Sequence, residues 1–336
     1  MSLSSEAWRF FDHHNIPIKK DFYLPQRDFD RSAYSYTLCG WHTLSDIPLT
    51  GLSTSVRGDK NVDILIQVTP GHAPPVEKKW SRGVLEHAGE GWLIKIQGVA
   101  DFEVIGGRQI RVWPAAGATQ KDIEIFLFGL AWATLCHQRE LLPLHASAIT
   151  TKRGIMAFAG PSGAGKSTTA ALMGSLGYEL VADDMLPISF NREAVPGAWP
   201  YLRRLKLEGG PIAQLALTPA ELVSEKLDKE KYFVRPKSVA DDKWNRLDRI
   251  YLLETATADS QAPIDQVTGA EAVRALVDHT YYLDFVPDSG RFRDHLALCT
   301  RLASKVTIYR LRLLTSLRID KELSSLLCAH LEDGVT

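Results

Sequence analysis

A glycine-rich segment in the middle of the chain has the residue types that bind phosphate groups. The run Gly160-Pro161-Ser162-Gly163-Ala164-Gly165-Lys166-Ser167 fits the pattern G-x-x-x-x-G-K-[ST] at every fixed position, and Thr168 follows it. Glycines let the backbone fold back so that several N–H groups converge on phosphate oxygens. The Lys166 ammonium can then reach the β and γ phosphates, and the Ser167 hydroxyl can ligate Mg²⁺. The sequence therefore predicts that residues 160–168 bind ATP together with Mg²⁺.

The segments on either side of this loop are those that phosphate binding requires. We expect an apolar strand at Ile155–Ala159, an Ala-rich helix over residues 166–176, and Gly177 as the helix terminator. Such a helix aims the positive end of its dipole at the bound anion. The alternative is a glycine-rich turn without a ligand, and the strand–loop–helix setting argues against it.

Two adjacent carboxylates follow at a spacing that returns the chain to the same place. Asp183 and Asp184 end the apolar run Leu180-Val181-Ala182, and Asp183 lies 17 residues after Lys166. One helix, a turn and a strand fill that spacing, so we expect the pair at the sheet edge that carries the loop. One carboxylate can hold Mg²⁺, and the other can accept a proton from an attacking hydroxyl. The structural alternative for the pair is an Asx turn or a helix cap.

One histidine completes the set of candidate site residues. His145 follows Pro143-Leu144 within an expected strand at Leu144–Ile149. From its neighbourhood alone, a histidine at a strand end is more often structural or partly exposed than catalytic.

In their order and spacing, these residues resemble the HPr kinase/phosphorylase-like P-loop kinases, which share a fold with phosphoenolpyruvate carboxykinase. His145 stands 15 residues before Gly160, and the acidic pair follows the loop closely. The resemblance implies an α/β kinase domain with ATP and Mg²⁺ as cofactors. It also implies that His145 lies near the transferred phosphate, that Asp183 is the catalytic base and that Asp184 helps to bind Mg²⁺. Because adjacent carboxylates titrate as a coupled pair, the two roles are open to exchange.

The wider pattern looks most like the kinases that phosphorylate lasso-peptide precursors. Cys39-Gly40-Trp41, the run from Leu141 to Ala148 and the run Val306–Leu311 carry this looser similarity. The glycine-containing signature that follows the acidic strand in the HPr enzymes is not recognisable, and Pro200–Leu207 stands in its place. The resemblance therefore implies that the acceptor is a serine hydroxyl of a peptide or protein, most of all a lasso-peptide precursor. The missing signature argues against HPr as the acceptor and against a reverse phosphorylase activity.

Several cations are secondary candidates for phosphate or substrate binding. Arg203, Arg204 and Lys206 interrupt an apolar pattern after the acidic strand, and a solvated strand edge is their alternative explanation. Further on, Lys231 or Arg235 could reach the γ-phosphate, because phosphoryl transfer depends on positioning and charge neutralisation.

The remaining pattern predicts an α/β chain with two domains. Short strands and a hairpin at Gly106-Gly107 fill the first third, and a helix that is apolar on all sides begins at an expected Thr119 N-cap. We place the boundary near residue 118, which gives a smaller β-rich domain (1–118) and a catalytic domain (119–336) with the helix packing across the junction. Residues 1–118 are the candidates for substrate recognition.

Composition limits the classes of partner and compartment. The chain of 336 residues has 39 Lys and Arg against 40 Asp and Glu, a formal net charge of −1, which argues against a broad nucleic-acid interface. The segment Met1–Asn15 does not read as a secretory signal, and the longest uncharged apolar run, Ile125–Cys136, is too short for a bilayer. Four scattered cysteines suggest reduced thiols. We expect a soluble, cytoplasmic protein without nucleic-acid or membrane partners, and a homo-oligomer is compatible with the sequence.

The sequence favours a Mg²⁺- and ATP-dependent serine kinase over two rivals. A small-molecule kinase would keep the same site and differ only in its acceptor. A nucleotide-switched binding or assembly module would bind ATP without a phosphorylated acceptor, and its function would survive Asp183→Asn. An ABC-type ATPase is disfavoured, because no LSGGQ-like segment is present.

Overall fold

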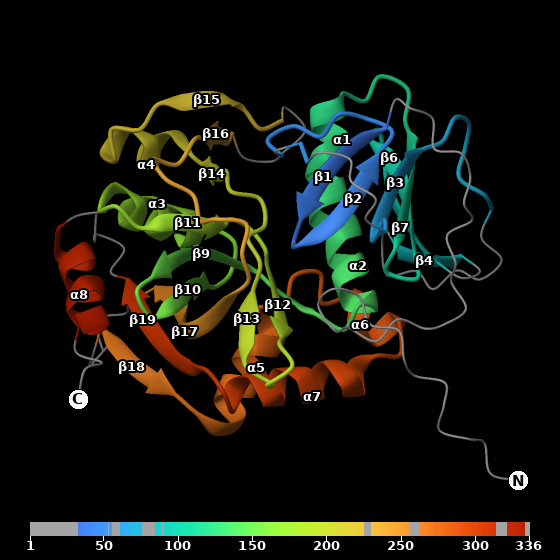
Figure 1. Ribbon diagram of the computed structural model, residues 1–336. Coiled ribbons are helices and arrows are strands. Elements are labelled where there is room, and N and C mark those ends of the chain that lie inside the picture. The colour runs from blue at the N-terminus through green and yellow to red at the C-terminus, as the bar shows by residue number, and fades with distance from the viewer. Residues whose placement is uncertain are drawn as a thin grey trace, which may run out of the picture. The chain divides into compact units, whose positions relative to one another are not determined.

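In the residues that it describes, the computed structural model has a mixed α/β fold with three β-sheets, shown in Figure 1. It describes residues 33–52, 54–55, 61–75, 85–88, 91–224, 230–255, 263–313 and 321–332. The expectation for Met1–Asn15 lies outside these ranges. The chain divides into two compact units. Unit 1 holds the described residues up to Pro143 together with Ser189–Val195 and Tyr282–His295, and unit 2 holds Leu144–Ile188, Pro196–Tyr281 and the described residues from Leu296 onward.

Unit 1 is built on a seven-stranded sheet with the strand order β1-β2-β3-β7-β6-β5-β4. The β2–β3 and β3–β7 pairs are parallel and the other neighbouring pairs are antiparallel. The expected β-rich character of this part of the chain is therefore present. Its strands are β1 (Tyr34–Leu38), β2 (Trp41–Ser45), β3 (Ile64–Val68), β4 (Leu85–Ala88), β5 (Gly91–Ile96), β6 (Ala100–Ile105) and β7 (Gln109–Pro114).

The predicted hairpin at Gly106-Gly107 joins β6 to β7. Gly106 and Gly107 have φ of 55° and 67°, the left-handed region in which glycine carries no Cβ penalty. A Cβ on Gly107 would also lie 2.8 Å from Cγ of Arg139. The turn therefore needs glycine for its conformation and for the close approach of Arg139.

A continuous helical segment follows the sheet and belongs to unit 1. It comprises α1 (Gln120–Phe126), a π-helical turn η1 (Leu127–Ala131) and α2 (Trp132–Gln138). Thr119 and Asp122 form a complete capping box, as expected from the sequence. The segment packs on β6. The ring centroid of its fully buried Trp132 lies 6.2 Å from that of Trp41. The compact units accordingly divide after Pro143, whereas the sequence suggested residue 118.

A buried histidine in unit 1 leads to a prediction about pH and stability. His295, near the start of α7 (Phe292–Ala303), is 5% exposed and its ring centroid lies 5.8 Å from that of His137. Burial lowers the pKa of His295 to about 4, below its ordinary value of 6.5. Because the folded state holds the neutral form, the free energy of unfolding should fall as the pH falls from about 6.5 towards 4. Urea unfolding of native protein and His295→Gln at pH 7 and pH 5 checks this, and an equal pH dependence in both would contradict it.

The main sheet has the strand order β11-β9-β10-β17-β13-β12-β8, with β19 and β18 joined beyond β17, and most of its residues belong to unit 2. The strands β10, β17 and β19 run parallel, and β9 is antiparallel to its neighbours. The bounds are β8 (Leu142–Leu144), β9 (Ala146–Thr151), β10 (Gly154–Ala159), β11 (Glu179–Ala182), β12 (Leu186–Phe190), β13 (Pro196–Ala198), β17 (Asn245–Thr255), β18 (Ile264–Val267) and β19 (Thr307–Leu313).

The segment β10–α3–β11 joins two strands that are not neighbours in the sheet. The helix α3 (Lys166–Ser175) connects β10 to β11, but β9 lies between these two strands in the sheet. Because β9 is antiparallel to both, β10 and β11 still run in the same direction. Their carboxyl ends therefore meet one edge of the sheet, which is the placement that the site requires.

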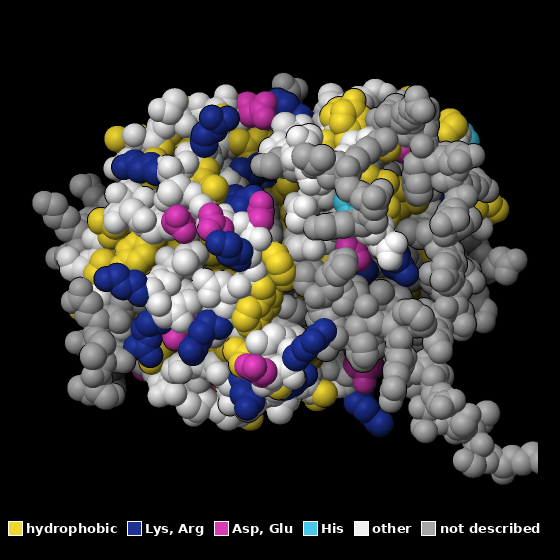
Figure 2. Space-filling view, in the orientation of Figure 1, with side chains coloured by type: hydrophobic (Ala, Val, Ile, Leu, Met, Phe, Trp, Pro, Cys, Tyr) yellow, Lys and Arg dark blue, Asp and Glu magenta, His cyan; other side chains and the backbone are white. Residues whose placement is uncertain are grey.

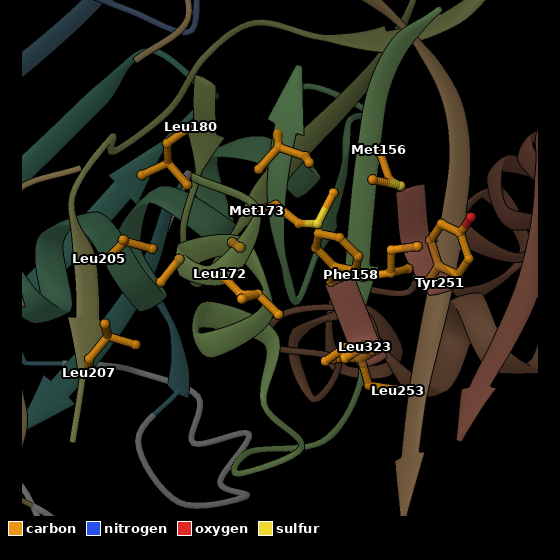
Figure 3. Close-up of a cluster of buried hydrophobic side chains, with 14 of the residues drawn as sticks. Met156, Phe158, Leu172, Met173, Leu180, Leu205, Leu207, Tyr251, Leu253 and Leu323 are labelled. Atoms are coloured by element: carbon orange, nitrogen blue, oxygen red, sulfur yellow. The ribbon is translucent and has the colours of Figure 1, made fainter. Parts of the chain in front are cut away.

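The third sheet, with the three strands β14-β16-β15 in that order, packs on α3 through β14. Its strands are β14 (Leu205–Leu207), β15 (Pro219–Leu222) and β16 (Tyr232–Val234). Figure 3 shows the buried apolar cluster that joins both sheets, α3 and α8 (Lys321–Glu332), and Met156 and Phe158 of β10 are among its members. The strand that leads into the glycine-rich loop is thus anchored in the core.

Truncating this core should destabilise the protein strongly. Met156 is fully buried, and we expect Met156→Ala to lower the free energy of unfolding by about 2–5 kcal/mol through lost burial and a residual cavity. Chemical denaturation measures the loss. Leu176→Ala is the matched control, because Leu176 is 50% exposed and should change stability little. A loss at Met156 no larger than that at Leu176 would contradict the prediction.

The other helices are α4 (Gly209–Gln214), α5 (Gly269–Asp278) and α6 (Phe285–Asp288). Within the described ranges, no helix has both the length and the apolar character needed to cross a bilayer. On the face shown in Figure 2, Lys and Arg side chains are interspersed with Asp and Glu, in line with the nearly balanced composition.

Candidate active site

Three strand ends bring the predicted site residues to one edge of the main sheet. In the sheet register Ala146, at the start of β9, pairs with Ala159, at the end of β10. Ala182, at the end of β11, pairs with Ala148 of β9. His145, the loop that begins at Gly160 and the acidic pair therefore all lie at this edge, and all belong to unit 2.

The glycine-rich loop has the backbone conformation that the motif predicts. Gly160, Gly163 and Gly165 have φ of 156°, 86° and 94°, backbone angles that residues other than glycine rarely adopt. A Cβ on Gly160 would lie 2.9 Å from the carbonyl oxygen of Leu253. Gly165 is the N-cap of α3 and has no side chain to cap it, so the first-turn amides can serve a bound anion.

Lys166 folds back onto the loop. The residue is 7% exposed, and its Nζ donates to the carbonyl oxygens of Gly160 and Pro161 at 2.9 and 3.0 Å. Burial lowers the pKa of Lys166 to about 8, the nearby Asp184 and Asp183 oppose this, and Lys231 adds to it. The Lys166 amine therefore stays mostly protonated at pH 7. Phosphate oxygens can replace the two carbonyl oxygens as its hydrogen-bond acceptors.

Asp183 is a buried carboxylate with defined partners. It is 2% exposed; its Oδ1 accepts from the Ser147 hydroxyl at 2.6 Å and its Oδ2 from the Lys206 backbone N–H at 2.8 Å. The Ser167 hydroxyl also donates to it. Burial is the main cause that raises the pKa of Asp183 above its ordinary value; Asp184 adds to the rise and the hydrogen bonds reduce it. A raised pKa gives this carboxylate the higher proton affinity that a general base needs.

Asp184 lies in a contrasting environment. Its φ of 74° turns the chain sharply after β11, a conformation that Asp tolerates better than most residues. Its Oδ2 pairs with Lys206 Nζ at 2.9 Å and its Oδ1 lies 3.5 Å from His145 Nε2. Burial alone would raise the pKa of Asp184, but Lys206 and His145 lower it well below its ordinary value. The Asp184 side chain is 33% exposed, so this carboxylate is partly accessible to solvent.

His145 is held by backbone contacts from another part of the chain. It lies between β8 and β9, so the expected strand at Leu144–Ile149 is interrupted at this residue. Its N–H donates to the His279 carbonyl oxygen at 2.8 Å, and Leu144 bridges to Thr280. The Tyr281 ring packs edge-on against the imidazole with 5.3 Å between the ring centroids. These contacts aim the imidazole at Asp184.

Of the secondary cations, the structure brings two close to the predicted site. Lys206 contacts both carboxylates, and the charge of Lys231 acts on Lys166. Arg203 instead pairs with Asp242 at 2.9 Å and with the Ala240 carbonyl, and the Arg204 guanidinium stacks over the Phe233 ring. Arg235 lines a small pocket against α3. A solvated strand edge does not describe Lys206, whose side chain is only 15% exposed.

Two site residues were missed by the sequence reasoning. Ser147 sits two positions after His145 on β9, fully buried against Asp183, and the alternation of the strand could have placed it on the site face. Tyr281 donates a hydrogen bond to Asp184, and burial raises its pKa well above the ordinary value. No local pattern marks Tyr281, because it reaches the site through the pairing of residues 144–145 with residues 279–280.

The residues present fit a magnesium ion bound together with phosphates. In the part of the chain that the structure describes, no three His, Cys, Asp or Glu side chains form a metal cage of their own. Mg²⁺ is commonly held by one or two carboxylates, a hydroxyl and nucleotide phosphates, all oxygen ligands. Asp184 offers a partly exposed, ionised carboxylate, and Ser167 offers a hydroxyl at the start of α3.

Comparison with known proteins leaves the chain without an assigned family. No family model matches it, and no curated protein matches it. Among solved structures, it is similar to the Hpr(Ser) kinase/phosphatase from Coxiella burnetii. The match has 10% identity and a TM-score of 0.31, and it covers 57% of this chain and 98% of that chain. At this level of similarity, the function must be argued from the residues of the site.

Proposed function

We propose that this protein is a kinase that transfers the γ-phosphoryl group of ATP, with Mg²⁺, to a hydroxyl group. The loop from Gly160 to Thr168 binds the phosphates, Lys166 neutralises them, and Ser167 and Asp184 hold the metal. Asp183 accepts the proton of the attacking hydroxyl, and His145 lies beside the transferred group. The assignments of the loop, the lysine and the carboxylates rest on the residue types and their shared sheet edge, and the place of His145 beside the transferred group rests on the family resemblance.

The observation that carries the proposal is the contrast between the two adjacent carboxylates. Burial raises the pKa of Asp183, whereas Lys206 and His145 lower the pKa of Asp184 although burial opposes them. Environments that push two neighbouring pKa values apart are typical of a base and a permanently charged partner. A nucleotide switch that transfers no phosphate requires an acid for its metal but no general base. The contrast therefore favours phosphoryl transfer.

The chain's own residues account for each requirement of an in-line transfer. The glycine loop and α3 position the phosphates, and Mg²⁺ when bound neutralises charge on their oxygens. Ser147 and the Lys206 N–H hold Asp183 in one orientation. Asp183 then takes the hydroxyl proton as the acceptor oxygen attacks the γ-phosphorus, and ADP leaves with its bridging oxygen.

For the acceptor, we extend the proposal to a serine of a peptide or protein, and a lasso-peptide precursor is the first acceptor to test. This step is supported by the sequence resemblance at residues 39–41, 141–148 and 306–311. We also extend it to a catalytic domain of the HPr kinase type and to peptide recognition by the β-rich N-terminal part of the chain. A small-molecule alcohol would use the same site.

Phosphate transfer measured by mass spectrometry tests the proposal. The protein is incubated with Mg²⁺-ATP and serine-containing precursor peptides, and parallel samples replace the peptide serine by alanine or the peptide by a panel of small alcohols. We expect a mass gain of one phosphate only on serine-containing peptides. Transfer only to small alcohols would retain the kinase and replace its acceptor. ATP binding without transfer to any acceptor would instead support a nucleotide switch.

A further inference from the structure

Lys206 makes two separate contacts with the acidic pair. Its backbone N–H donates to Asp183 Oδ2 at 2.8 Å, and its ammonium pairs with Asp184 Oδ2 at 2.9 Å. One residue of β14 therefore touches both carboxylates, the first through the main chain and the second through the side chain. The two contacts can be separated experimentally, because a substitution at this position removes the ammonium and keeps the N–H.

The fold fixes Lys206 at this position. Tyr201 N–H donates to the Val181 carbonyl, and Asp183 N–H donates to the Leu202 carbonyl, so the segment before β14 runs beside the end of β11. Within β14, Leu205 and Leu207 are 3% and 2% exposed and belong to the apolar core. Successive side chains of a strand point to opposite faces, so Lys206 points away from that core, towards the acids.

The Lys206 ammonium contacts one oxygen of Asp184, the carboxylate proposed above as a metal ligand. The Lys206 side chain is 15% exposed, so its charge is screened less than that of a surface lysine. A divalent cation on the same carboxylate would lie close to this fixed positive charge, and two like charges at such a distance repel each other. Binding of the metal must therefore either displace the ammonium from Asp184 or accept this repulsion.

We propose that Lys206 is a positioning residue that occupies Asp184 in the absence of metal and competes with Mg²⁺ for it. The inference rests on the proposed assignment of Asp184 as a metal ligand. With no metal bound, the ammonium holds the Asp184 carboxylate in one orientation. When Mg²⁺ binds with the nucleotide, the ammonium leaves Asp184, and a long lysine side chain at this edge can then contact the phosphate or acceptor oxygens. Lys206 thus couples metal occupancy to the arrangement of the site.

Metal affinity tests this inference without requiring turnover. Mn²⁺ is the probe, because it accepts the same oxygen ligands and is detected by electron paramagnetic resonance. Mn²⁺ is titrated into native protein, Lys206→Met and Lys206→Arg with a non-hydrolysable ATP analogue present. We expect Lys206→Met to bind Mn²⁺ on the order of tenfold more tightly, since a neighbouring positive charge is lost, and Lys206→Arg to stay near the native affinity.

The direction of the expected change separates this role from a structural one. A site that merely collapses on loss of Lys206 would bind metal more weakly, whereas the inference requires a gain. Lys243→Met is the matched control, because the Lys243 side chain is 80% exposed and pairs with Asp241 on the surface. Equal or weaker Mn²⁺ affinity in Lys206→Met, with an unfolding curve like that of the native protein, would overturn the inference. Phosphate transfer by the native protein, measured in the same preparation, reports on the proposed function independently.

Discussion

Replacing Asp183 by Asn is expected to lower the rate of phosphate transfer by about 10²–10⁴-fold, the usual contribution of a general base. Asn keeps the size of the side chain, and its carbonyl oxygen can still accept from the Ser147 hydroxyl, which lies 2.6 Å from Asp183 Oδ1. The amide cannot take up a proton from the attacking hydroxyl. Because Lys166 and the glycine loop remain, the affinity for ATP should change little.

Single-turnover transfer with radiolabelled ATP measures the chemical step, and equilibrium binding of a fluorescent ATP analogue measures affinity separately. Asp242→Asn is the control, since the Asp242 side chain is half exposed and pairs with Arg203. Asp184→Asn should instead raise the Mg²⁺ concentration needed for transfer. If Asp183→Asn transfers phosphate at the native rate while Asp184→Asn fails at saturating Mg²⁺, the roles of the two carboxylates are exchanged. ATP-dependent binding or assembly that survives Asp183→Asn, with no phosphate transfer by the native protein, would favour a nucleotide switch.

The phosphate loop could be predicted from the sequence because its determinants are local. Glycines at positive φ, a lysine and a hydroxyl follow one another between a strand and a helix, and the structure has these elements at β10 and α3. The acidic pair was placed by the number of residues that one helix and one strand consume. That argument depends only on the direction of β10 and β11, so the insertion of β9 between them does not affect it.

The remainder of the site depends on contacts between residues far apart in the chain. Ser147 reaches Asp183 across the β9–β11 pair, and Tyr281 reaches Asp184 from a turn after α5. Strands of three residues, such as β13 and β14, carry too little periodicity to be recognised, although β14 delivers Lys206. The helix from residue 120 to 138 is buried on several sides, and its pattern alone did not reveal which sheet it packs on.

In the folded chain, the positive charges of the site lie opposite its negative charges. Lys166 and Lys206 face Asp183 and Asp184, and Lys231 lies close enough to act on Lys166. Bound phosphates add several negative charges next to these lysines. We expect their main effect to be on the hydrogen bonds of the Lys166 ammonium. This ammonium is bonded to loop carbonyls, and charged phosphate oxygens are stronger acceptors than neutral carbonyls.

Removing that ammonium is therefore expected to impair both binding and transfer. We expect Lys166→Met to reduce transfer by about 10²–10³-fold, the usual cost of losing one preorganised group that stabilises transition-state charge, and to weaken ATP binding. Methionine fills a similar volume in this buried position, so the free energy of unfolding should stay close to that of the native protein. Single-turnover transfer and analogue binding provide the measurements, and Lys152→Met, at an exposed turn between β9 and β10, is the control. Native transfer by a folded Lys166→Met would show that the glycine-rich loop does not hold the transferred phosphate.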